Sequence, residues 1–378
     1  MKIAFDHQAF TLQKTGGISR YFCRLADHLG KPSDRSPNNV SVGIFAPVYR
    51  NQYLREVPQS IVHGYAVKDY LFKTATVCVN ANRLIARHLI KKWQPDIVHE
   101  TYFSSKQIAP AACPVVLTVF DMISELDLIA KGCSKKDLRT TNKYKSVMRA
   151  DHIICISEST KKDLIDLFEI APEIISVIYL ACDPVGRKYT CNAQLANQRP
   201  YLLYVGLRGG YKNFNGLLRA ISSSPRIMKE FDLLAFGGGT FSAVEKNLIK
   251  ELGYGEGQVK QFGGGDDVLD SLYTTAAALV YPSTYEGFGL PPLEAMSHQC
   301  PVISSDRSSM PEIIGQAGQY FDPQSIESMT SAVESVVFSS SRSQELIRLG
   351  LERHELFTWD RCARETLSVY RELAPLVQ

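Results

Sequence analysis

The hydrophobic pattern of the chain alternates between short apolar runs and longer mixed segments. The apolar runs of the first half predict strands at 2–6, 41–46, 96–99, 114–119, 152–156 and 175–180. Apolar residues at helical spacing predict helices at 18–29, 80–92 and 159–168. The second half repeats this style, with predicted strands at 201–205, 231–236, 277–281 and 301–304. Continuous apolar strands separated by helices indicate parallel sheets that are covered by helices on both faces.

The two halves of this pattern predict two domains of the α/β class. A chain of 378 residues is longer than a single hydrophobic core usually organises. A polar stretch at 182–199 has no hydrophobic periodicity, so we expect the boundary there. Each set of strands fits a doubly wound, Rossmann-like sheet, and the two domains are expected to face each other across a cleft.

Composition narrows the class of protein. No run of about 18 apolar residues is present, and the first residues lack the pattern of a secretory leader, so we expect a cytoplasmic protein. The nine cysteines are scattered singly, which argues against a disulfide framework or a structural zinc site. The net charge is +3, and basic residues exceed acidic ones within residues 1–180. That excess indicates either an anionic neighbour or simply a solvated surface.

The strongest candidate site is the run Tyr285–Met296, which follows a predicted strand. Gly287 and Gly289 allow the backbone to approach a ligand closely, and the two prolines that follow fit the first turn of a helix. Such a helix start offers N–H groups and a positive dipole to an anion. Glu286 and Glu294, the latter expected in the first turn, can accept hydrogen bonds from sugar hydroxyls. A plain capping turn with two solvated glutamates is the alternative.

A second candidate site opens the second half of the chain. The run Tyr204–Phe214 contains a strand, a glycine-rich turn and two cations four residues apart, Arg208 and Lys212. Two cations at such a turn can clamp a diphosphate, and arginine can do so with two parallel hydrogen bonds. The alternative is that both side chains are simply solvated beside the turn.

A weaker candidate lies near the N-terminus. The run Thr15–Tyr21 places Gly16 and Gly17 at a predicted helix start. Asp6 and His7 come at the end of the first predicted strand, the edge at which ligands meet parallel sheets. A glycine pair alone more often marks an ordinary turn.

The run at 285–296 resembles the Glu-x7-Glu motif of the retaining GT-B glycosyltransferases, the sucrose-synthase-like and bacterial mannosyltransferase-like group. Its continuation through 301–305 and 308–312 agrees with that family, and a looser likeness extends over nearly the whole chain. The resemblance implies a GT-B fold. It further implies an acceptor-side Rossmann-like domain at 1–190, completed by a C-terminal helix at 363–378, and a nucleotide-sugar-binding Rossmann-like domain at 191–362.

The resemblance also implies roles for the candidate residues. The catalytic set is Glu286, which lies near the transferred sugar, with Arg208 and Lys212 on the diphosphate. Donor-binding roles fall to the ribose-binding Glu294, to the backbone at Gly287, Phe288, Gly289 and Leu290, to Gly263 beside the base, and to the glycine loop at Gly16 and Gly17.

One position departs from the family pattern. Where the family commonly has a histidine that contacts the transferred sugar, this chain has Phe120, followed by Asp121. His99, at the end of another predicted strand, is the candidate that would face the cleft instead, and the alternative is a structural histidine, which is the commoner role of a lone histidine at a strand end. An apolar ring at 120 favours a donor that carries a methyl group there. The candidates on the acceptor or sugar side are therefore His7, His99, Phe120 and Asp121.

Together these features predict a retaining glycosyltransferase that moves a hexosyl group from a nucleotide sugar to a saccharide acceptor. Mannosyl is the first choice and 6-deoxyhexosyl the second, in bacterial surface polysaccharide or glycolipid assembly. A phosphorylase or a nucleotide-sugar epimerase or hydrolase on the same fold stays an alternative, as does a non-catalytic glycan- or nucleotide-binding module. No Asp-x-Asp ends a predicted strand, so neither a metal nor another cofactor is expected. No basic–aromatic motif indicates nucleic acid.

The basic segments of the first half bear on where the protein works. Segments 83–92 and 135–149 are rich in lysine and arginine, which favours peripheral attachment to the anionic inner face of a membrane. A lipid-linked saccharide acceptor would agree with that location. A helix that packs on its own sheet explains 83–92 equally well.

Overall fold

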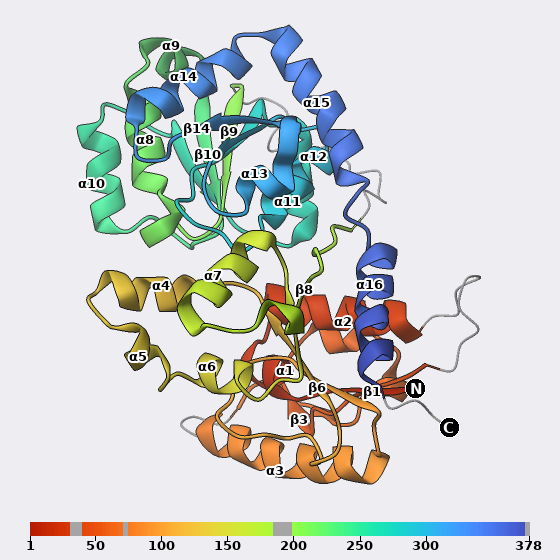
Figure 1. Ribbon diagram of the computed structural model, residues 1–378. Coiled ribbons are helices and arrows are strands. Elements are labelled where there is room, and N and C mark those ends of the chain that lie inside the picture. The colour runs from red at the N-terminus through yellow and green to blue at the C-terminus, as the bar shows by residue number, and fades with distance from the viewer. Residues whose placement is uncertain (31–39, 71–74, 184–198, 375–378) are drawn as a thin grey trace. The chain divides into compact units, whose positions relative to one another are not determined.

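The computed structural model of the protein describes residues 1–30, 40–70, 75–183 and 199–374. These residues form two compact units, each built around its own parallel sheet (Figure 1). Unit 1 contains Met1–Ala181 and Trp359–Gln378, and unit 2 contains Cys182–Thr358. The predicted boundary between residues 190 and 191 lies outside the described residues.

Unit 1 is a six-stranded parallel sheet in the order β2-β1-β5-β6-β7-β8. Every residue of β5 and β6 is buried, which explains why β6 appears in the sequence as a nearly continuous apolar run. The strands are β1 (Lys2–Phe5), β2 (Ser41–Ile44), β5 (Ile97–Glu100), β6 (Val115–Val119), β7 (His152–Cys155) and β8 (Ile175–Val177), with β3 (Val48–Tyr49) and β4 (Tyr65–Ala66) forming a separate pair. The helices of residues 1–181 are α1 (Gln8–Leu12), α2 (Gly17–Gly30), α3 (Ala75–Trp93), α4 (Ile123–Ala130), α5 (Lys135–Leu138), α6 (Asn142–Val147) and α7 (Glu158–Phe168).

A helix from the far end of the chain completes unit 1. This helix, α16 (Trp359–Leu373), packs against α2, and Figure 1 shows the two side by side. Its Tyr370 is fully buried, and its hydroxyl lies 2.5 Å from Nδ1 of His99 on β5. Residues more than 250 positions apart in sequence therefore share one core.

Unit 2 repeats the architecture with a six-stranded parallel sheet in the order β11-β10-β9-β12-β13-β14. The strands are β9 (Tyr201–Val205), β10 (Asp232–Phe236), β11 (Val259–Phe262), β12 (Ala278–Tyr281), β13 (Val302–Ser305) and β14 (Gly318–Phe321). The helices are α8 (Phe214–Ser222), α9 (Pro225–Glu230), α10 (Ala243–Glu251), α11 (Asp266–Thr275), α12 (Leu290–Ser297), α13 (Met310–Ile314), α14 (Ile326–Val337) and α15 (Ser340–His354). The α/β fold with two Rossmann-like sheets is the predicted one.

In unit 2 the prediction missed β11 and β14, which are the two edges of its sheet, and in unit 1 it missed the short pair β3 and β4. The four residues of β11 are all only partly buried, as are the two central residues of β14. An edge strand is only partly covered, so its sequence lacks the unbroken apolar run on which the prediction relied.

Candidate active site

The ends of two neighbouring strands in unit 2 bring Lys212 and Glu286 together. Lys212 lies in a short turn after β9, and Glu286 lies in the loop after β12. The Lys212 Nζ donates to Glu286 Oε1 at 2.6 Å and to the Tyr281 hydroxyl at 3.2 Å. The two charged side chains are only 15% and 10% exposed, so each supplies the counter-charge that the other needs in a buried position. Two motifs that are separate in the sequence therefore form one site.

Two serines fix the loop that carries Glu286. The Glu286 backbone N–H donates to Ser308 Oγ at 2.8 Å. The Ser309 hydroxyl donates to the backbone carbonyls of Glu286 and Phe288, at 2.9 and 2.8 Å. Sequence reasoning noted these serines only as a continuation of the family motif and gave them no role. The structure shows that they hold the loop 286–288 in place.

Helix α12 begins at Leu290, as predicted from the glycines before it and from the two prolines in its first turn. Gly289 has φ +116°, and a Cβ atom there would lie 2.6 Å from Met310 Cε, so this position requires glycine. The helix has no side-chain cap at its first turn within the described residues. Its positive end is thus set in the same loop as Glu286.

Glu294 lies one turn further into α12 than predicted. The helix starts at Leu290, and no acidic residue falls in its first turn. The carboxylate is half-buried and accepts a hydrogen bond from the Tyr273 hydroxyl at 3.1 Å. Tyr273 is fully buried on α11, so this hydrogen bond fixes the position of the Glu294 carboxylate. The Glu294 side chain stays partly exposed.

Arg208 has a different environment from the one expected of a phosphate clamp. Its Nε donates to Glu245 Oε1 at 2.7 Å, and its Nη1 donates to the Gly237 carbonyl at 2.7 Å. Its Nη2 donates to further carbonyls of the loop 237–240. The side chain is only 4% exposed. The guanidinium therefore braces this loop, and direct contact between Arg208 and a diphosphate stays a prediction.

The other predicted donor-binding positions are backbone elements. Gly263 is exposed at the end of β11. Gly16 and Gly17 belong to unit 1, where α2 starts at Gly17. A Cβ atom on Gly16 would lie 2.6 Å from Oε1 of Gln13, so a larger residue would displace the side chain that accepts the Ser19 N–H.

Phe120 and Asp121 line a pocket of about 300 Å³ in unit 1. The Phe120 ring is half-buried and meets Tyr21 edge-on, with 5.5 Å between ring centroids. Asp121 Oδ1 accepts the N–H of Ile123 at 3.1 Å, and Lys143 Nζ lies 3.8 Å from the same oxygen. An apolar ring and a carboxylate thus lie beside one cavity, and contact of either with a sugar stays a prediction.

His99 lies in the core, which corrects the interpretation that placed it on the sugar side. It is fully buried, and both ring nitrogens have partners: Nδ1 with the Tyr370 hydroxyl at 2.5 Å and Nε2 with the Thr118 hydroxyl at 2.8 Å. Burial lowers the pKa of His99 to about 3. The physical reason is α16, which covers the end of β5 and which the pattern around residue 99 does not reveal.

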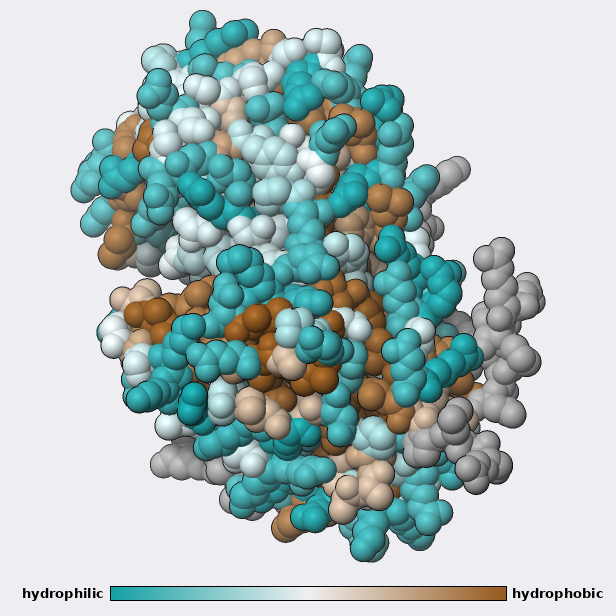
Figure 2. Space-filling view, in the orientation of Figure 1, coloured by the Kyte–Doolittle hydropathy of each residue, from teal (hydrophilic) through white to brown (hydrophobic). Residues whose placement is uncertain are grey.

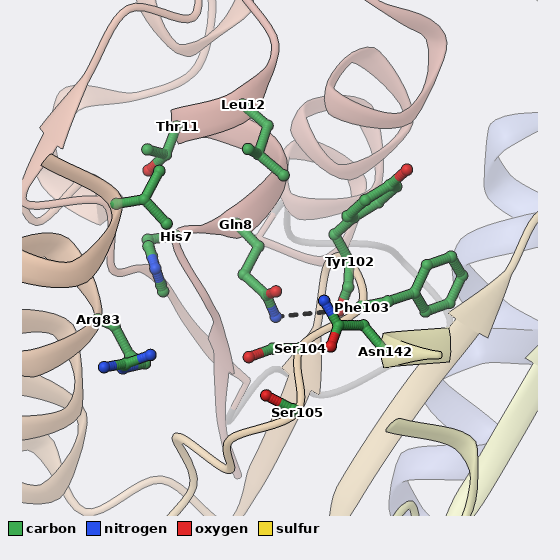
Figure 3. Close-up of a pocket in the computed structure, with 11 residues that line it drawn as sticks. His7, Gln8, Thr11, Leu12, Arg83, Tyr102, Phe103, Ser104, Ser105 and Asn142 are labelled. Carbon is green, nitrogen blue, oxygen red and sulfur yellow. Dashed lines mark hydrogen bonds between the residues drawn. The ribbon is translucent and has the colours of Figure 1, made fainter. Parts of the chain in front are cut away.

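His7 lines a second pocket of unit 1, of about 340 Å³ (Figure 3). The adjoining Asp6 is fully buried, and its oxygens accept hydrogen bonds from Gln8 and Thr101. Asp6 therefore ties α1 to the end of β5. The sequence-based candidates missed Arg83, which lies in the same pocket and which we had assigned to the basic segment 83–92.

The two basic segments have different environments. One face of α3 packs on the sheet through the buried Ala86 and Ile90. The other face leaves Leu84 64% and Ile85 46% exposed among basic residues. The interpretation of 83–92 as a helix that packs on its own sheet is thus confirmed for one face, and attachment of the other face to a membrane stays a prediction.

Segment 135–149 has fewer basic side chains free to meet an anionic surface than the sequence predicts. Lys143 is buried and forms an ion pair with Glu125, and Arg149 Nη2 lies 2.5 Å from Glu100 Oε2. These two cations are used inside unit 1, which corrects the expectation that they face an anionic surface.

The chain matches two family models. Residues 15–185 match the model described as Glycosyltransferase Family 4, and residues 191–352 match Glycosyl transferases group 1. Among curated relatives, the O-antigen chain mannosyltransferase B of Escherichia coli is 32% identical over 61% of this chain and 63% of its own length. The MMP alpha-(1->4)-mannosyltransferase of Mycolicibacterium hassiacum is 25% identical over 73% of this chain and 70% of its own length. The chain thus spans less than two thirds of the length of the first of these relatives.

Solved structures show the same fold at low sequence identity. A sucrose-phosphate synthase from Thermosynechococcus elongatus has a TM-score of 0.75 at 18% identity and covers 98% of each chain. Anabaena Alr3699/HepE in complex with UDP-glucose has a TM-score of 0.70 at 18% identity, over 97% of this chain and 99% of its own. The two family models together match most of the sequence, and the fold is GT-B. The chain therefore combines a region that is similar to family 4 glycosyltransferases, residues 15–185, with a region that is similar to group 1 glycosyltransferases, residues 191–352.

Proposed function

We propose that the protein is a retaining glycosyltransferase that moves a hexosyl group from a nucleotide sugar to a saccharide acceptor. The observation that carries this proposal is the ion pair of Lys212 and Glu286 beside the glycine-led start of α12. A buried cation that contacts the loop before a helix N-terminus suits a diphosphate, and the carboxylate suits the hydroxyls of a sugar. Mannose is the first sugar to test because the curated relatives include mannosyltransferases.

In the proposed reaction the protein works mainly by electrostatics. The acceptor hydroxyl attacks the anomeric carbon on the face from which the diphosphate leaves. The bond from that carbon to the phosphate oxygen breaks, and the leaving phosphate accepts the hydroxyl proton. Lys212 and the start of α12 stabilise the negative charge that grows on the diphosphate. A preorganised group of this kind typically contributes about 3 kcal/mol to lowering the barrier.

The contact between Lys212 and Glu286 gives each residue a role before and during the reaction. The carboxylate compensates the buried lysine when no diphosphate is near, so the cation is held in place at a low cost. When a donor binds, the same Nζ can turn to a phosphate oxygen, and Glu286 becomes free to meet a sugar hydroxyl. Glu294, held by Tyr273, is proposed to accept hydrogen bonds from the ribose.

The proposal also covers the chemical class of the acceptor and the biosynthetic process in which the transfer takes place. We propose that the protein acts in bacterial surface polysaccharide or glycolipid assembly, on an acceptor saccharide that is linked to a lipid. A relative with an O-antigen name supports this setting. No metal is part of the proposed mechanism, because Lys212 and the helix start supply the positive charge.

A donor screen tests the function. Thermal shifts with GDP, UDP and dTDP identify the base, because a ligand at 100 times its Kd adds about 2.7 kcal/mol of stability. GDP-mannose and its 6-deoxy counterparts are then incubated with and without saccharide acceptors, and the product anomer is read by NMR. Retention with acceptor-dependent release of the nucleotide supports the proposal. Sugar release that is independent of acceptor, or that requires inorganic phosphate, would instead identify a hydrolase, an epimerase or a phosphorylase.

A further inference from the structure

The 340 Å³ pocket of unit 1 contains a buried histidine whose hydrogen bonding is incomplete. His7 is 3% exposed, and its Nδ1 has no hydrogen-bond partner in the described structure. Burial lowers the pKa of His7, against the opposing effect of Asp6, so the ring is neutral near pH 7. A buried polar atom without a partner costs stability unless a ligand or a water satisfies it. A hydroxyl can pair with this nitrogen in either tautomer.

The same pocket contains a cation, Arg83, that forms no ion pair with any of the described residues. Arg83, on α3, is half-buried and lines the pocket, and the described residues include no carboxylate in an ion pair with it. The carboxylate oxygens of Asp6 accept hydrogen bonds from Gln8 and Thr101, and no ion pair joins Asp6 to Arg83 among the described residues. Figure 3 shows His7 and Arg83 on one side of the pocket, with Ser104 and Ser105 across from them.

The pocket also adjoins the cavity that Phe120 lines. Tyr102, Phe103 and Asn142 line both pockets, so they form a shared wall. A ligand with more than one ring could therefore occupy both pockets, with its near end beside Phe120 and its far end beside Arg83. The polar residues of the far pocket suit a ligand rich in hydroxyls.

We propose that this pocket binds an anionic substituent, a phosphate or a carboxylate, on the hydroxylated acceptor of the transfer reaction. Arg83 pairs with the anion, and His7 pairs with a hydroxyl of the same sugar unit. Arginine matches both kinds of anion because its planar fork presents two parallel N–H groups. This inference rests on the proposed function, since it assigns the substrate class of the acceptor.

Direct binding without any donor tests the pocket separately from catalysis. The full-length protein is titrated by calorimetry with methyl α-mannoside, mannose 6-phosphate, glucuronate and inorganic phosphate. We expect at least one anionic sugar to bind about tenfold more tightly than the neutral one, and the stronger of the two identifies the substituent. Equal affinity for neutral and anionic sugars, or no binding of either anionic sugar, overturns the proposal. Inorganic phosphate that binds as tightly as the sugar phosphate also overturns it.

Variants test whether the preference for anionic sugars arises from the residues of this pocket. Arg83→Gln should remove the preference for anionic sugars, whereas Arg55→Gln, at an exposed arginine of unit 1 outside the pocket, should retain it. His7→Leu should weaken the neutral and the anionic sugars alike, with its fold checked by circular dichroism. An equal loss in Arg83→Gln and Arg55→Gln contradicts the assignment.

Kinetics then separates the two proposals. With an anionic acceptor, Arg83→Gln should raise the acceptor KM about tenfold and leave kcat nearly unchanged, because the contact lies away from the reacting atoms. If nucleotide binding and transfer succeed while the sugar preference is absent, only the pocket proposal fails. If the sugars bind as expected but no nucleotide sugar is used, the proposed function fails.

Discussion

Lys212 and Glu294 illustrate how the contacts of a single residue decide which kinetic constant it controls. Lys212→Ala removes a cation that meets charge growing in the transition state, so kcat should fall by about two to three decades. Glu294→Ala removes a contact that exists in the ground state as well, so the donor KM should rise. The measurement is steady-state kinetics with the donor that the screen identifies.

The matched control for Lys212 is Lys250, an exposed lysine on α10 of the same unit. Lys250→Ala should be indistinguishable from the unchanged protein. Near-normal kinetics in both Lys212→Ala and Glu294→Ala would contradict the assignment of the site to this loop.

Phe120 leads to a prediction about the donor sugar. Its ring lines a pocket where the family commonly presents a histidine, so a sugar hydroxyl facing it would lose a hydrogen bond, at a cost of about 1–3 kcal/mol. A methyl group in that place would gain from the contact. We therefore expect a higher kcat/KM for a 6-deoxyhexosyl donor than for its 6-hydroxy counterpart on the same nucleotide.

Phe120→His should shift this preference toward the 6-hydroxy sugar. The experiment is a competition assay in which the unchanged protein and Phe120→His are each incubated with a mixture of the two donors. A preference for the 6-hydroxy sugar that is the same in both proteins would end the hypothesis and leave mannose as the donor.

The sequence does not predict the contacts of a residue where a distant segment decides its environment. The glycines and prolines around Gly289 predict the start of α12 because the constraint is local. The partners of Arg208 come from a loop about 30 residues further along the chain, and nothing near Arg208 in sequence reveals them. The same holds for His99, whose partner is on α16.

At the scale of elements, the contact between α16 and β5 predicts a dependence of stability on pH. His99 is buried and neutral, with a pKa of about 3 that its burial causes. Below about pH 6.5 the unfolded chain binds a proton that the folded chain does not. The free energy of unfolding should therefore fall with decreasing pH, by about 1.4 kcal/mol per pH unit from this group, until pH 3 is approached.

The variant His99→Gln isolates this contribution. It should be less stable than the unchanged protein at pH 8, and the difference between the two should shrink as the pH falls below 6.5. The difference is needed because Glu100, with a pKa raised to about 7 by burial, adds an opposite slope between about pH 4.5 and 7 in both proteins. Denaturant titrations at several pH values measure it, and a difference independent of pH would contradict the argument.

The sheets show which elements a sequence can predict. Central strands such as β6 and β9 are buried at every position, so their sequences are unbroken apolar runs. The edge strands β11 and β14 are partly exposed, and their residues Val259–Phe262 and Gly318–Phe321 have no clear period. Their positions become clear only once β10 and β13 provide the partners with which they pair.

At the scale of the whole molecule, the surface of unit 1 bears on membrane attachment. No helix in the part of the chain that the structure describes is long and apolar enough to cross a bilayer. Hydrophobic residues gather over α4 in Figure 2, where Leu126, Leu128 and Ile129 are partly buried in the core of unit 1. The exposed face of α3 differs, because Leu84 and Ile85 project among basic residues.

We predict that this face of α3 binds anionic vesicles. Each basic residue near an anionic leaflet contributes about 1 kcal/mol, so the charge reversals Arg87→Glu and Lys91→Glu together should abolish sedimentation with the vesicles at low salt. Lys136→Glu with Lys145→Glu, on the segment whose Lys143 and Arg149 form ion pairs inside unit 1, should have the smaller effect. Equal partitioning of the unchanged protein onto anionic and neutral vesicles would contradict the prediction.

The position of α16 has a consequence for how the protein is made. Residues 1–181 leave the ribosome early, yet they cannot bury the face that α16 covers until residue 373 has been synthesised. Residues 182–358 contain a whole sheet and its helices, so this later-made part can finish folding before the earlier one. A chain that stops before Trp359 would lack the α16 residues that contact Tyr21 and His99. Such a nascent chain would expose apolar surface and would depend on chaperones until α16 has been made.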